Sequence, residues 1–373
     1  MTNHVSLIYT LAYRAGVLGL SSALTLLENL PPEKFEVLLV ASHFPTDPPH
    51  PSYATTNAGA HYRPIPATTQ QLKDESQLAQ FTHEKFKKLA IAKPELGVKL
   101  LEGIDYVSGD AAPAYKALLP EYTSVDGFRV LRKDEMPAGV EFGARYDSYT
   151  VDTETYMFHL LRRFRIDGGQ LLRKHLDSAS EAFYFEGRDV RLVINCSGMG
   201  FGDPKSFIIR GINLSFTLAA PMIIFTDRKS LLGQTCLVSN PCGSTITQQN
   251  ADGTWTFTVP RALGGGTIVG GTKQVNDWDP NPSLAVREEL LKNVAKLYPA
   301  LLGAEGKLDV IRDVVGRRPA REGGLRLEVE KLPDQRNIVH AYGAGGRGFE
   351  LSWGVAEEVW NMVKSTMPAL SKL

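Results

Sequence analysis

Near its carboxyl end the chain reads Ile338-Val-His-Ala-Tyr-Gly343-Ala-Gly345-Gly346-Arg-Gly348-Phe-Glu-Leu-Ser-Trp-Gly354-Val-Ala356. Four glycines fill six positions, after an apolar pair at 338–339 and before a helical pattern at 355–363. Closely spaced glycines accept positive φ angles and let a ligand approach the backbone. A helix that begins after such a loop directs unpaired N–H groups and a positive dipole end toward it. The stretch predicts either a site for a group that gains negative charge or a glycine-rich turn before a packing helix.

Length and composition limit the classes of protein to which the chain can belong. The chain has 373 residues, which is long for a single hydrophobic core, so two interleaved domains are expected. Its 41 lysines and arginines balance 41 aspartates and glutamates, which predicts no nucleic-acid partner. No run is apolar and long enough to span a bilayer, so no membrane partner is expected. The three scattered cysteines predict reduced thiols inside a cell, and none has the spacing of metal ligands.

A second glycine-containing stretch lies near the amino end and reads Arg14-Ala15-Gly16-Val17-Leu18-Gly19. A dinucleotide-binding turn needs a glycine for the tight turn, one for approach of the diphosphate and one for helix packing. Gly16 and Gly19 fill the second and third places, but Arg14 stands in the first. Three interpretations remain open: a remodelled turn whose guanidinium meets a phosphate, a damaged cofactor site, or an ordinary turn from strand to helix.

Hydrophobic periodicity predicts strands and helices in alternation, with short strands gathered in the second half. Strands are expected at 7–13, 35–40 and 188–197, and an antiparallel sheet within 208–272. Helices are expected at 17–30, 155–164, 171–183, 284–297 and 355–363, and the charged segment 68–93 is expected to form a long exposed helix.

The carboxyl-terminal glycine stretch also resembles a known signature. The order His340-Ala-Tyr342-Gly343-x-Gly345-Gly346-x-Gly348, followed after five residues by Gly354-x-Ala356, is similar to that of the D-amino-acid oxidase and D-aspartate oxidase family. The resemblance runs from 16 to 356 and suggests a fungal-type member that uses FAD. It implies an α/β fold with a Rossmann-type FAD-binding domain and a mixed-sheet substrate-binding domain. The first would comprise residues 1–65, 151–205 and 309–373, and the second residues 66–150 and 206–308.

The resemblance assigns cofactor contacts to the amino-terminal turn, to the end of the second strand, to a small-residue loop, to the end of a later strand and to the glycine stretch. These residues are Ala15, Gly16, Val17, Leu18, Gly19, Ser42, His43, Thr56, Asn57, Ala58, Gly59, Ser197, Gly198, Gly345, Gly346, Gly348, Phe349 and Glu350. The second strand ends in Ala41-Ser42-His43 without the acid that usually binds the adenosine ribose, so a nicotinamide cofactor gains no support. His61 is either a base or, more simply, a structural histidine. Cys196 is expected to be a packed thiol.

Substrate contacts follow from the family's Gly-x-Arg-Pro motif, which stands here at 316–319. In the family, the arginine that corresponds to Arg318 binds the α-carboxylate of the substrate, so Arg318 is the candidate catalytic residue. A planar guanidinium matches two carboxylate oxygens and fixes the orientation of the molecule. Gly346 is also assigned to the substrate. Arg317 and Arg321 are expected to be surface or structural residues.

Two further positions bear on the substrate. Phe257 stands where the family usually has a tyrosine whose hydroxyl contacts the substrate carboxylate, and its alternative role is sheet core, on one strand face with Trp255 and Val259. Lys273 stands where D-aspartate oxidases have an arginine. It is either a cation for a side-chain carboxylate or a solvated lysine at a strand end.

The activity that the resemblance implies is oxidative deamination of D-amino acids by FAD and molecular oxygen. Lys273 favours acidic substrates, and the alternative is a broad oxidase of neutral D-amino acids in which Lys273 points to solvent. Two further alternatives remain open: a homologue impaired in FAD binding, because of Arg14 and Phe257, and an oxidase of another amine on the same fold. The sequence ends in Ser371-Lys372-Leu373, which is a peroxisomal address when free and terminal, so import by the peroxisomal receptor into the matrix is expected. The oligomeric state is left open, with a homodimer among the assemblies considered.

Overall fold

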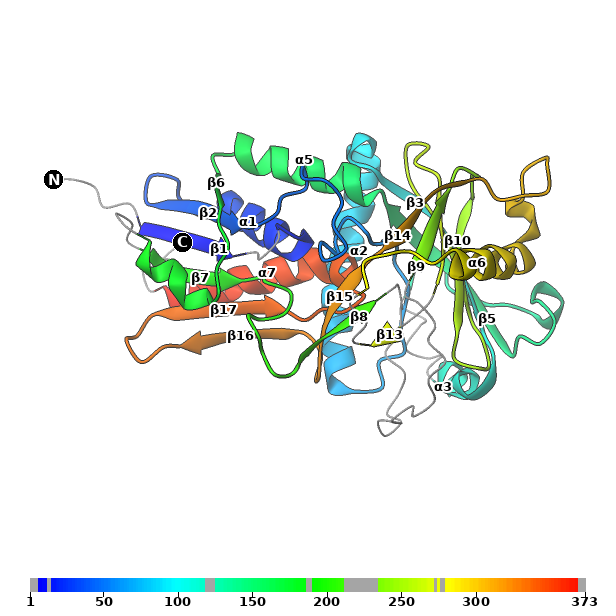
Figure 1. Ribbon diagram of the computed structural model, residues 1–373. Helices are drawn as coiled ribbons and strands as arrows, with labels where there is room; N and C mark the ends of the chain where they lie inside the picture. The colour runs from blue at the N-terminus through cyan, green and yellow to red at the C-terminus, as the bar shows by residue number, and fades with distance from the viewer. Residues whose placement is uncertain are drawn as a thin grey trace.

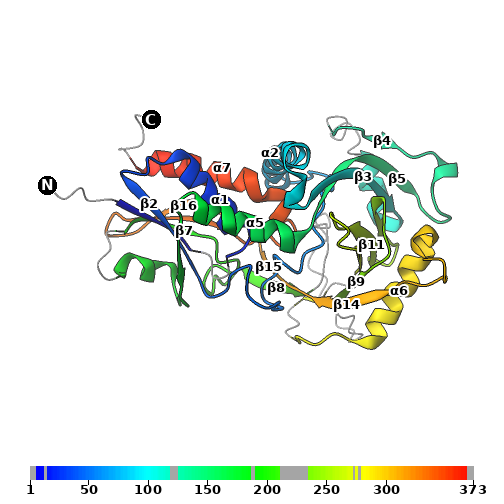
Figure 2. The same cartoon turned by 90° about the horizontal axis from the view of Figure 1, so that it is seen from above.

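The computed structural model describes residues 6–11, 15–117, 125–185, 190–210, 234–271, 274–275 and 279–367. Three of the sequence's candidate features therefore lie outside the described residues: Arg14, Lys273 and the segment 371–373. The molecule is elongated, with a six-stranded sheet toward one end, an eight-stranded sheet toward the other, and helix α2 and a small three-stranded sheet between them (Figures 1 and 2).

The six-stranded sheet has the order β16-β17-β7-β1-β2-β6. Its strands are β1 (Ser6–Leu11), β2 (Phe35–Ala41), β6 (Gln170–Arg173), β7 (Val190–Asn195), β16 (Arg326–Lys331) and β17 (Asn337–Tyr342). Neighbouring strands are parallel except β16 and β17, which are antiparallel. The carboxyl ends of five strands therefore meet along one edge, which is where open α/β sheets place their ligands.

Helices α1 (Val17–Asn29), α5 (Thr153–Ile166) and α7 (Gly348–Thr366) accompany this sheet, and α2 (Gln70–Ala92) packs on α7. In α7, Leu351, Val355, Val359 and Val363 recur every four residues and are all buried, so one apolar face of the helix packs on the core. α7 contacts both α1 and α2. The expected start of this helix at 355 is wrong by two turns, because the glycine-rich loop ends at Gly348 and the helix begins there.

The eight-stranded sheet has the order β14-β9-β12-β11-β10-β3-β5-β4. Its strands are β3 (Val98–Val107), β4 (Arg129–Val130), β5 (Phe142–Val151), β9 (Gln234–Val238), β10 (Ser244–Gln249), β11 (Trp255–Pro260), β12 (Thr267–Gly270) and β14 (Val310–Val315). All pairs are antiparallel except β3 and β10. Helix α6 (Leu284–Leu297) packs on β9, β11 and β12, within the bounds that the sequence predicts.

The smaller elements complete the fold. The three-stranded sheet consists of β13 (Gln274–Val275), β8 (Ser206–Arg210) and β15 (Arg317–Arg321). The short helices are α3 (Ala112–Ala117) and the 3₁₀ segments η1 (Pro94–Leu96), η2 (Gly109–Ala111), η3 (Lys133–Glu135), η4 (Ala179–Tyr184) and η5 (Pro299–Leu301).

Two predicted helices need correction. The helix expected at 171–183 is wrong, because residues 170–173 pair with the edge of β2 as strand β6 and only 179–184 turn helically. Pairing with an existing sheet edge overrides the local helical pattern. The helix expected at 68–93 is present, but it is not exposed along its length. The Gly354 N–H of α7 donates to Thr82 Oγ1 at 2.9 Å, and a Cβ at Gly354 would lie 2.3 Å from the Leu78 carbonyl oxygen.

Two details differ from the expected sheet and domain boundaries. Within 208–272, β8 belongs to the three-stranded sheet and β10 pairs in parallel with β3, so this region is only partly one antiparallel sheet. The expected cofactor part includes 309–373, yet β14 joins the eight-stranded sheet beside β9. The division into two domains otherwise stays a prediction.

Candidate functional site

A cavity of about 500 Å³ lies along the carboxyl ends of the parallel strands. It is lined by residues 16–18, 52–55, 57–61, 175–177, 196–199, 201–202, 208, 235, 314, 316–319, 343–346 and 348–350. The lining therefore includes loops of the six-stranded sheet together with Thr235 of β9 and Val314 of β14, from the eight-stranded sheet. A ligand in this cavity would contact both parts of the molecule.

The turn after β1 forms one wall, where helix α1 begins. The N-cap residue Gly16 has no side chain to cap the helix, so the first N–H groups depend on other partners. Thr55 Oγ1 accepts a hydrogen bond from the Val17 N–H at 3.3 Å, and the Tyr53 hydroxyl donates to the Ala15 carbonyl at 2.6 Å. The loop 52–55 thus fixes the turn that precedes α1.

The glycine stretch forms a second wall, where helix α7 begins. Gly343 and Gly345 have φ angles of 85° and 57°, a left-handed conformation that other residues seldom adopt. The Gly345 N–H donates to the Pro319 carbonyl at 2.9 Å. A Cβ at Gly348 would lie 3.6 Å from Val17 Cγ1, so the first turns of α7 and α1 are in contact.

Two helix amino termini therefore meet at one cavity. Neither helix has a side-chain N-cap. Apart from the Val17 N–H, which Thr55 Oγ1 accepts, the N–H groups of the two first turns and the two positive dipole ends form an anion site that fits the diphosphate of a dinucleotide. Small residues at 57–59, 197–198 and 343–346 allow close approach of a flat or extended ligand. The lining thus fits FAD, the cofactor that the resemblance implies.

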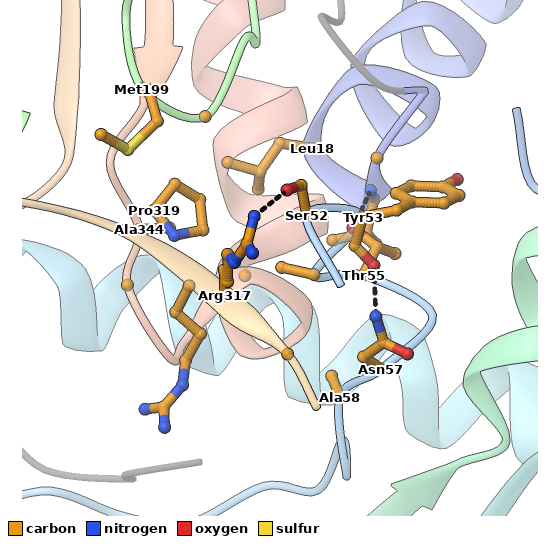
Figure 3. A pocket seen from close by; sticks show the side chains of 18 of the residues that line it. Leu18, Ser52, Tyr53, Thr55, Asn57, Ala58, Met199, Arg317, Pro319 and Ala344 are labelled. Carbon is orange, nitrogen blue, oxygen red and sulfur yellow. Dashed lines mark hydrogen bonds between the residues drawn. The ribbon is translucent and has the colours of Figure 1, made fainter. Parts of the chain in front are cut away.

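Strand β15 carries two arginines into the lining. Arg318 is 7% exposed, and burial lowers its pKa to about 9, which leaves the guanidinium protonated at neutral pH. Arg317 also lines the cavity, and its Nη1 donates to Ser52 Oγ at 2.9 Å (Figure 3). The contact with Ser52 fits the structural role expected of Arg317, while its place in the lining also exposes it to a ligand in the cavity. Arg321, by contrast, forms an ion pair of 2.7 Å with Asp203.

His61 lines the cavity in a neutral state. The residue is 2% exposed, and neither ring nitrogen has a hydrogen-bond partner among the described residues. Burial, and then the nearby charge of Arg63, lower the pKa of His61 to about 3. Its backbone bridges to Thr150 in β5. This burial fits a structural histidine. The position of His61 in the lining also allows it to contact a ligand.

Behind the start of α7 lies a buried charge cluster. Arg347 Nη1 is 2.6 Å from Glu75 Oε2 on α2, and Arg347 Nη2 is 2.6 Å from Glu350 Oε1 in the first turn of α7. The three side chains are at most 7% exposed. Glu350 also lines the cavity, so the cluster joins α2 to the cofactor side of the site.

Most of the predicted cofactor residues line the cavity, as do the predicted substrate residues Arg318 and Gly346. The cofactor residues that line it are Gly16, Val17, Leu18, Asn57, Ala58, Gly59, Ser197, Gly198, Gly345, Gly346, Gly348, Phe349 and Glu350. Those that do not are Ala15, Gly19, Ser42, His43 and Thr56. Ser42 Oγ and His43 Nδ1 lie 2.9 Å apart and bond each other, while the His43 carbonyl accepts from the Ala15 N–H at 2.8 Å.

The structure corrects the assignment of Phe257 as a substrate contact. Phe257 is 1% exposed and lies in a core cluster with Leu237, Val259, Ile268 and Val314 rather than in the cavity lining. A Cβ at Gly270 would lie 2.6 Å from the end of the Phe257 ring, so the ring fills space beside the neighbouring strand. The alternative interpretation, sheet core, holds for this residue.

Several lining segments are not expected from the sequence, including 52–54, 175–177 and the residues 199, 201 and 202. The segment 175–177 follows β6 and falls inside the helix wrongly expected at 171–183. A signal was available in Ser178 and Glu181, whose capping box marks the start of a helical turn and leaves the preceding residues as a loop. The segment 52–54 carries no comparable signal in the sequence.

Comparison with known proteins identifies the family. The family model described as FAD dependent oxidoreductase matches residues 15–362 of the chain. The protein belongs to this family. A D-aspartate oxidase from Talaromyces thermophilus is 40% identical over 371 residues, covering 94% of each chain. A D-amino-acid oxidase from Fusarium vanettenii is 30% identical and covers 96% of this chain and 98% of its own.

Solved structures support the fold. The glycine oxidase from Geobacillus kaustophilus superposes with a TM-score of 0.70 at 16% identity, covering 96% of this chain and 94% of its own. The predicted family, α/β fold class and FAD cofactor are therefore confirmed. Within the described residues, no helix is long and apolar enough to cross a membrane, and no group of three or more His, Cys, Asp or Glu could hold a metal ion.

Proposed function

We propose that this FAD-dependent oxidoreductase converts D-amino acids, water and oxygen into 2-oxo acids, ammonia and hydrogen peroxide. The observation that carries the proposal is Arg318, a buried and protonated arginine in the same cavity as the first turns of α1 and α7. The relatives named D-aspartate oxidase and D-amino-acid oxidase, which align over more than nine-tenths of the chain, support it.

Arg318 would bind the α-carboxylate of the substrate. A buried guanidinium gains most from an anion that accepts two parallel hydrogen bonds, and this pairing fixes the rotation of the bound molecule. Fixing that rotation determines which substituent of Cα faces the cofactor, and only one enantiomer then presents its single Cα hydrogen there. Arg318 is 7% exposed, so little water competes for this pairing, which strengthens it.

The chain's contribution on the cofactor side is electrostatic. FAD, when bound, supplies the acceptor for the hydride from Cα and passes the electrons to oxygen. The start of α1 would hold the diphosphate, and the start of α7 would stabilise negative charge that develops on the ligand in front of it. Gly198 and the glycines of 343–348 would leave room for the backbone to approach the cofactor.

The finer proposal is a preference for D-aspartate and D-glutamate. It rests on the D-aspartate oxidase relative and on Lys273, whose position in the sequence offers a cation for a side-chain carboxylate. Comparing kcat/KM for D-aspartate, D-glutamate, D-alanine and D-methionine tests the preference. If Lys273→Met leaves the ratio of acidic to neutral substrates unchanged, Lys273 does not recognise the side chain.

The residues Ser371-Lys372-Leu373 suggest where the activity is used. We propose that, as a free carboxyl terminus, they direct the protein to the peroxisome matrix through the import receptor, where peroxide is contained. A fluorescent protein ending in the last residues of this chain should gather in peroxisomes. Removal of the three residues should leave it diffuse.

The central experiment uses the purified protein. A flavin absorption band should be present, and under anaerobic conditions D-amino acids should bleach it while their L-enantiomers should not. In air, each D-amino acid consumed should yield one peroxide. Absence of bound flavin after reconstitution would support the FAD-impaired alternative, and bleaching by other amines instead of D-amino acids would support an oxidase of another substrate.

A further inference from the structure

Arg317 is a second arginine in the cavity, and neither the proposed reaction nor the family motif gives it a role. The motif fixes only its neighbours Gly316, Arg318 and Pro319. Adjacent residues of a strand point to opposite faces, so Arg317 and Arg318 leave β15 in different directions although both line the same cavity. Arg317 therefore serves a different part of the cavity from the one that Arg318 serves.

The contacts of Arg317 place it on the loop that fixes the start of α1. Its Nη1 donates to Ser52 Oγ at 2.9 Å, and its backbone N–H donates to the Pro51 carbonyl at 2.9 Å. The same loop fixes α1, through the Tyr53 hydroxyl on the Ala15 carbonyl and through Thr55 Oγ1 on the Val17 N–H. In Figure 3 the Arg317 side chain reaches Ser52 in the region where Leu18, in the first turn of α1, also projects.

A cation next to a helix amino terminus forms a stronger anion site than the helix alone. The dipole end of α1 carries only a partial positive charge, whereas a guanidinium carries a full charge and several donors. Ser52 holds the guanidinium in a defined orientation, so less side-chain entropy is lost when an anion binds. The diphosphate of FAD is the anion that this arrangement fits.

We propose that Arg317 binds the diphosphate of FAD, together with the first turn of α1. The proposal concerns the cofactor alone, so it stands or falls separately from the choice of substrate. Arg318 recognises the carboxylate of the amino acid, while Arg317 recognises the phosphate of the cofactor. One short strand thus supplies a cation to each ligand.

Binding to the apoprotein tests this role directly. Arg317→Gln should raise the Kd of FAD on the order of tenfold or more, because a charge-assisted contact to phosphate is lost. Arg317→Lys keeps a cation and should recover part of the affinity. ADP should stabilise the wild-type apoprotein against heat more than adenosine does, and Arg317→Gln should remove that difference.

Two controls separate phosphate binding from a structural role. Arg312→Gln makes the same chemical change on β14, outside the cavity lining, and should leave FAD affinity within about twofold of the wild type. Ser52→Ala removes the anchor but keeps the guanidinium, so it should weaken FAD binding less than Arg317→Gln does. At saturating FAD, the KM for the amino acid should be unchanged in Arg317→Gln.

Three results would overturn the proposal. The first is an unchanged Kd for FAD in Arg317→Gln. The second is an equal loss of riboflavin and FAD binding, which indicates a general disturbance of the cavity rather than a lost phosphate contact. The third is an ADP advantage over adenosine that survives the substitution.

Discussion

Replacing Arg347 with alanine should destabilise the protein far more than replacing an exposed arginine. The guanidinium is 4% exposed and contacts the carboxylates of Glu75 and Glu350 at 2.6 Å each. These carboxylates are 7% and 4% exposed, so the substitution leaves two buried negative charges without their cation. Removing one partner of a buried ion pair costs about 3–5 kcal/mol, and we expect a loss of this size in the free energy of unfolding.

Chemical denaturation of the apoprotein by urea, followed by circular dichroism, measures this loss without a contribution from bound FAD. Arg132→Ala is the matched control, because Arg132 and its partner Asp134 are both 71% exposed, and we expect it to cost less than about 1 kcal/mol. Combining Arg347→Leu with Glu75→Gln and Glu350→Gln removes all three charges and should restore much of the stability.

If Arg347→Ala lowers the free energy of unfolding by no more than Arg132→Ala does, the two carboxylates are hydrated, which contradicts a buried charge cluster. A triple variant that is less stable than Arg347→Ala also contradicts it, because neutralising the two unpaired carboxylates would then restore no stability. FAD affinity gives a second readout. Since Glu350 lies in the first turn of α7, a shifted helix start in Arg347→Ala should weaken FAD binding as well.

Three further predictions concern the site. Arg318→Ala should lower kcat/KM for D-amino acids by several orders of magnitude, about 4–6 kcal/mol in transition-state binding, while FAD stays bound; an unchanged kcat/KM removes Arg318 from the site. His61 has a folded-state pKa below its unfolded value, so its burial favours folding less as pH falls below about 6.5. Lowering the pH from 7 to 5 should therefore cost the wild type about 2 kcal/mol that His61→Gln does not lose, and parallel stability curves for the two proteins would contradict the buried, neutral histidine. Arg14→Gly should tighten FAD binding by restoring the first glycine of the turn, whereas weaker binding identifies Arg14 itself as a phosphate ligand.

Local sequence patterns predict those helices and loops whose conformation depends mainly on their own residues. The bounds of α6 follow from its apolar spacing and from the Ser283 N-cap, and the sequence predicts them without help from the rest of the chain. The glycine stretch predicts a loop and a helix start because positive φ angles require glycine at Gly343 and Gly345. The place of Arg318 in the cavity agrees with what the family motif implies.

Features that depend on distant partners could not be predicted. Strand β6 forms because the edge of β2 is available to pair with it, and nothing in 170–173 encodes that edge. Arg347 and Glu75 are 272 residues apart in sequence, so no local spacing connects them. Arg317 resembles a surface arginine in the sequence because the group that orients it, Ser52, is 265 residues away.

The order of strands in the six-stranded sheet has a consequence for synthesis on the ribosome. Strand β7 lies between β1, near the start of the chain, and β17, which ends at Tyr342. The walls of the cavity come from residues as early as Gly16 and as late as Glu350. A nascent chain can form α1 and pair β1 with β2 early, but it cannot close the cavity until the last segment has emerged. FAD can therefore be enclosed only after Glu350 has left the ribosome, and a message truncated before α7 yields a protein that lacks one wall of the cavity.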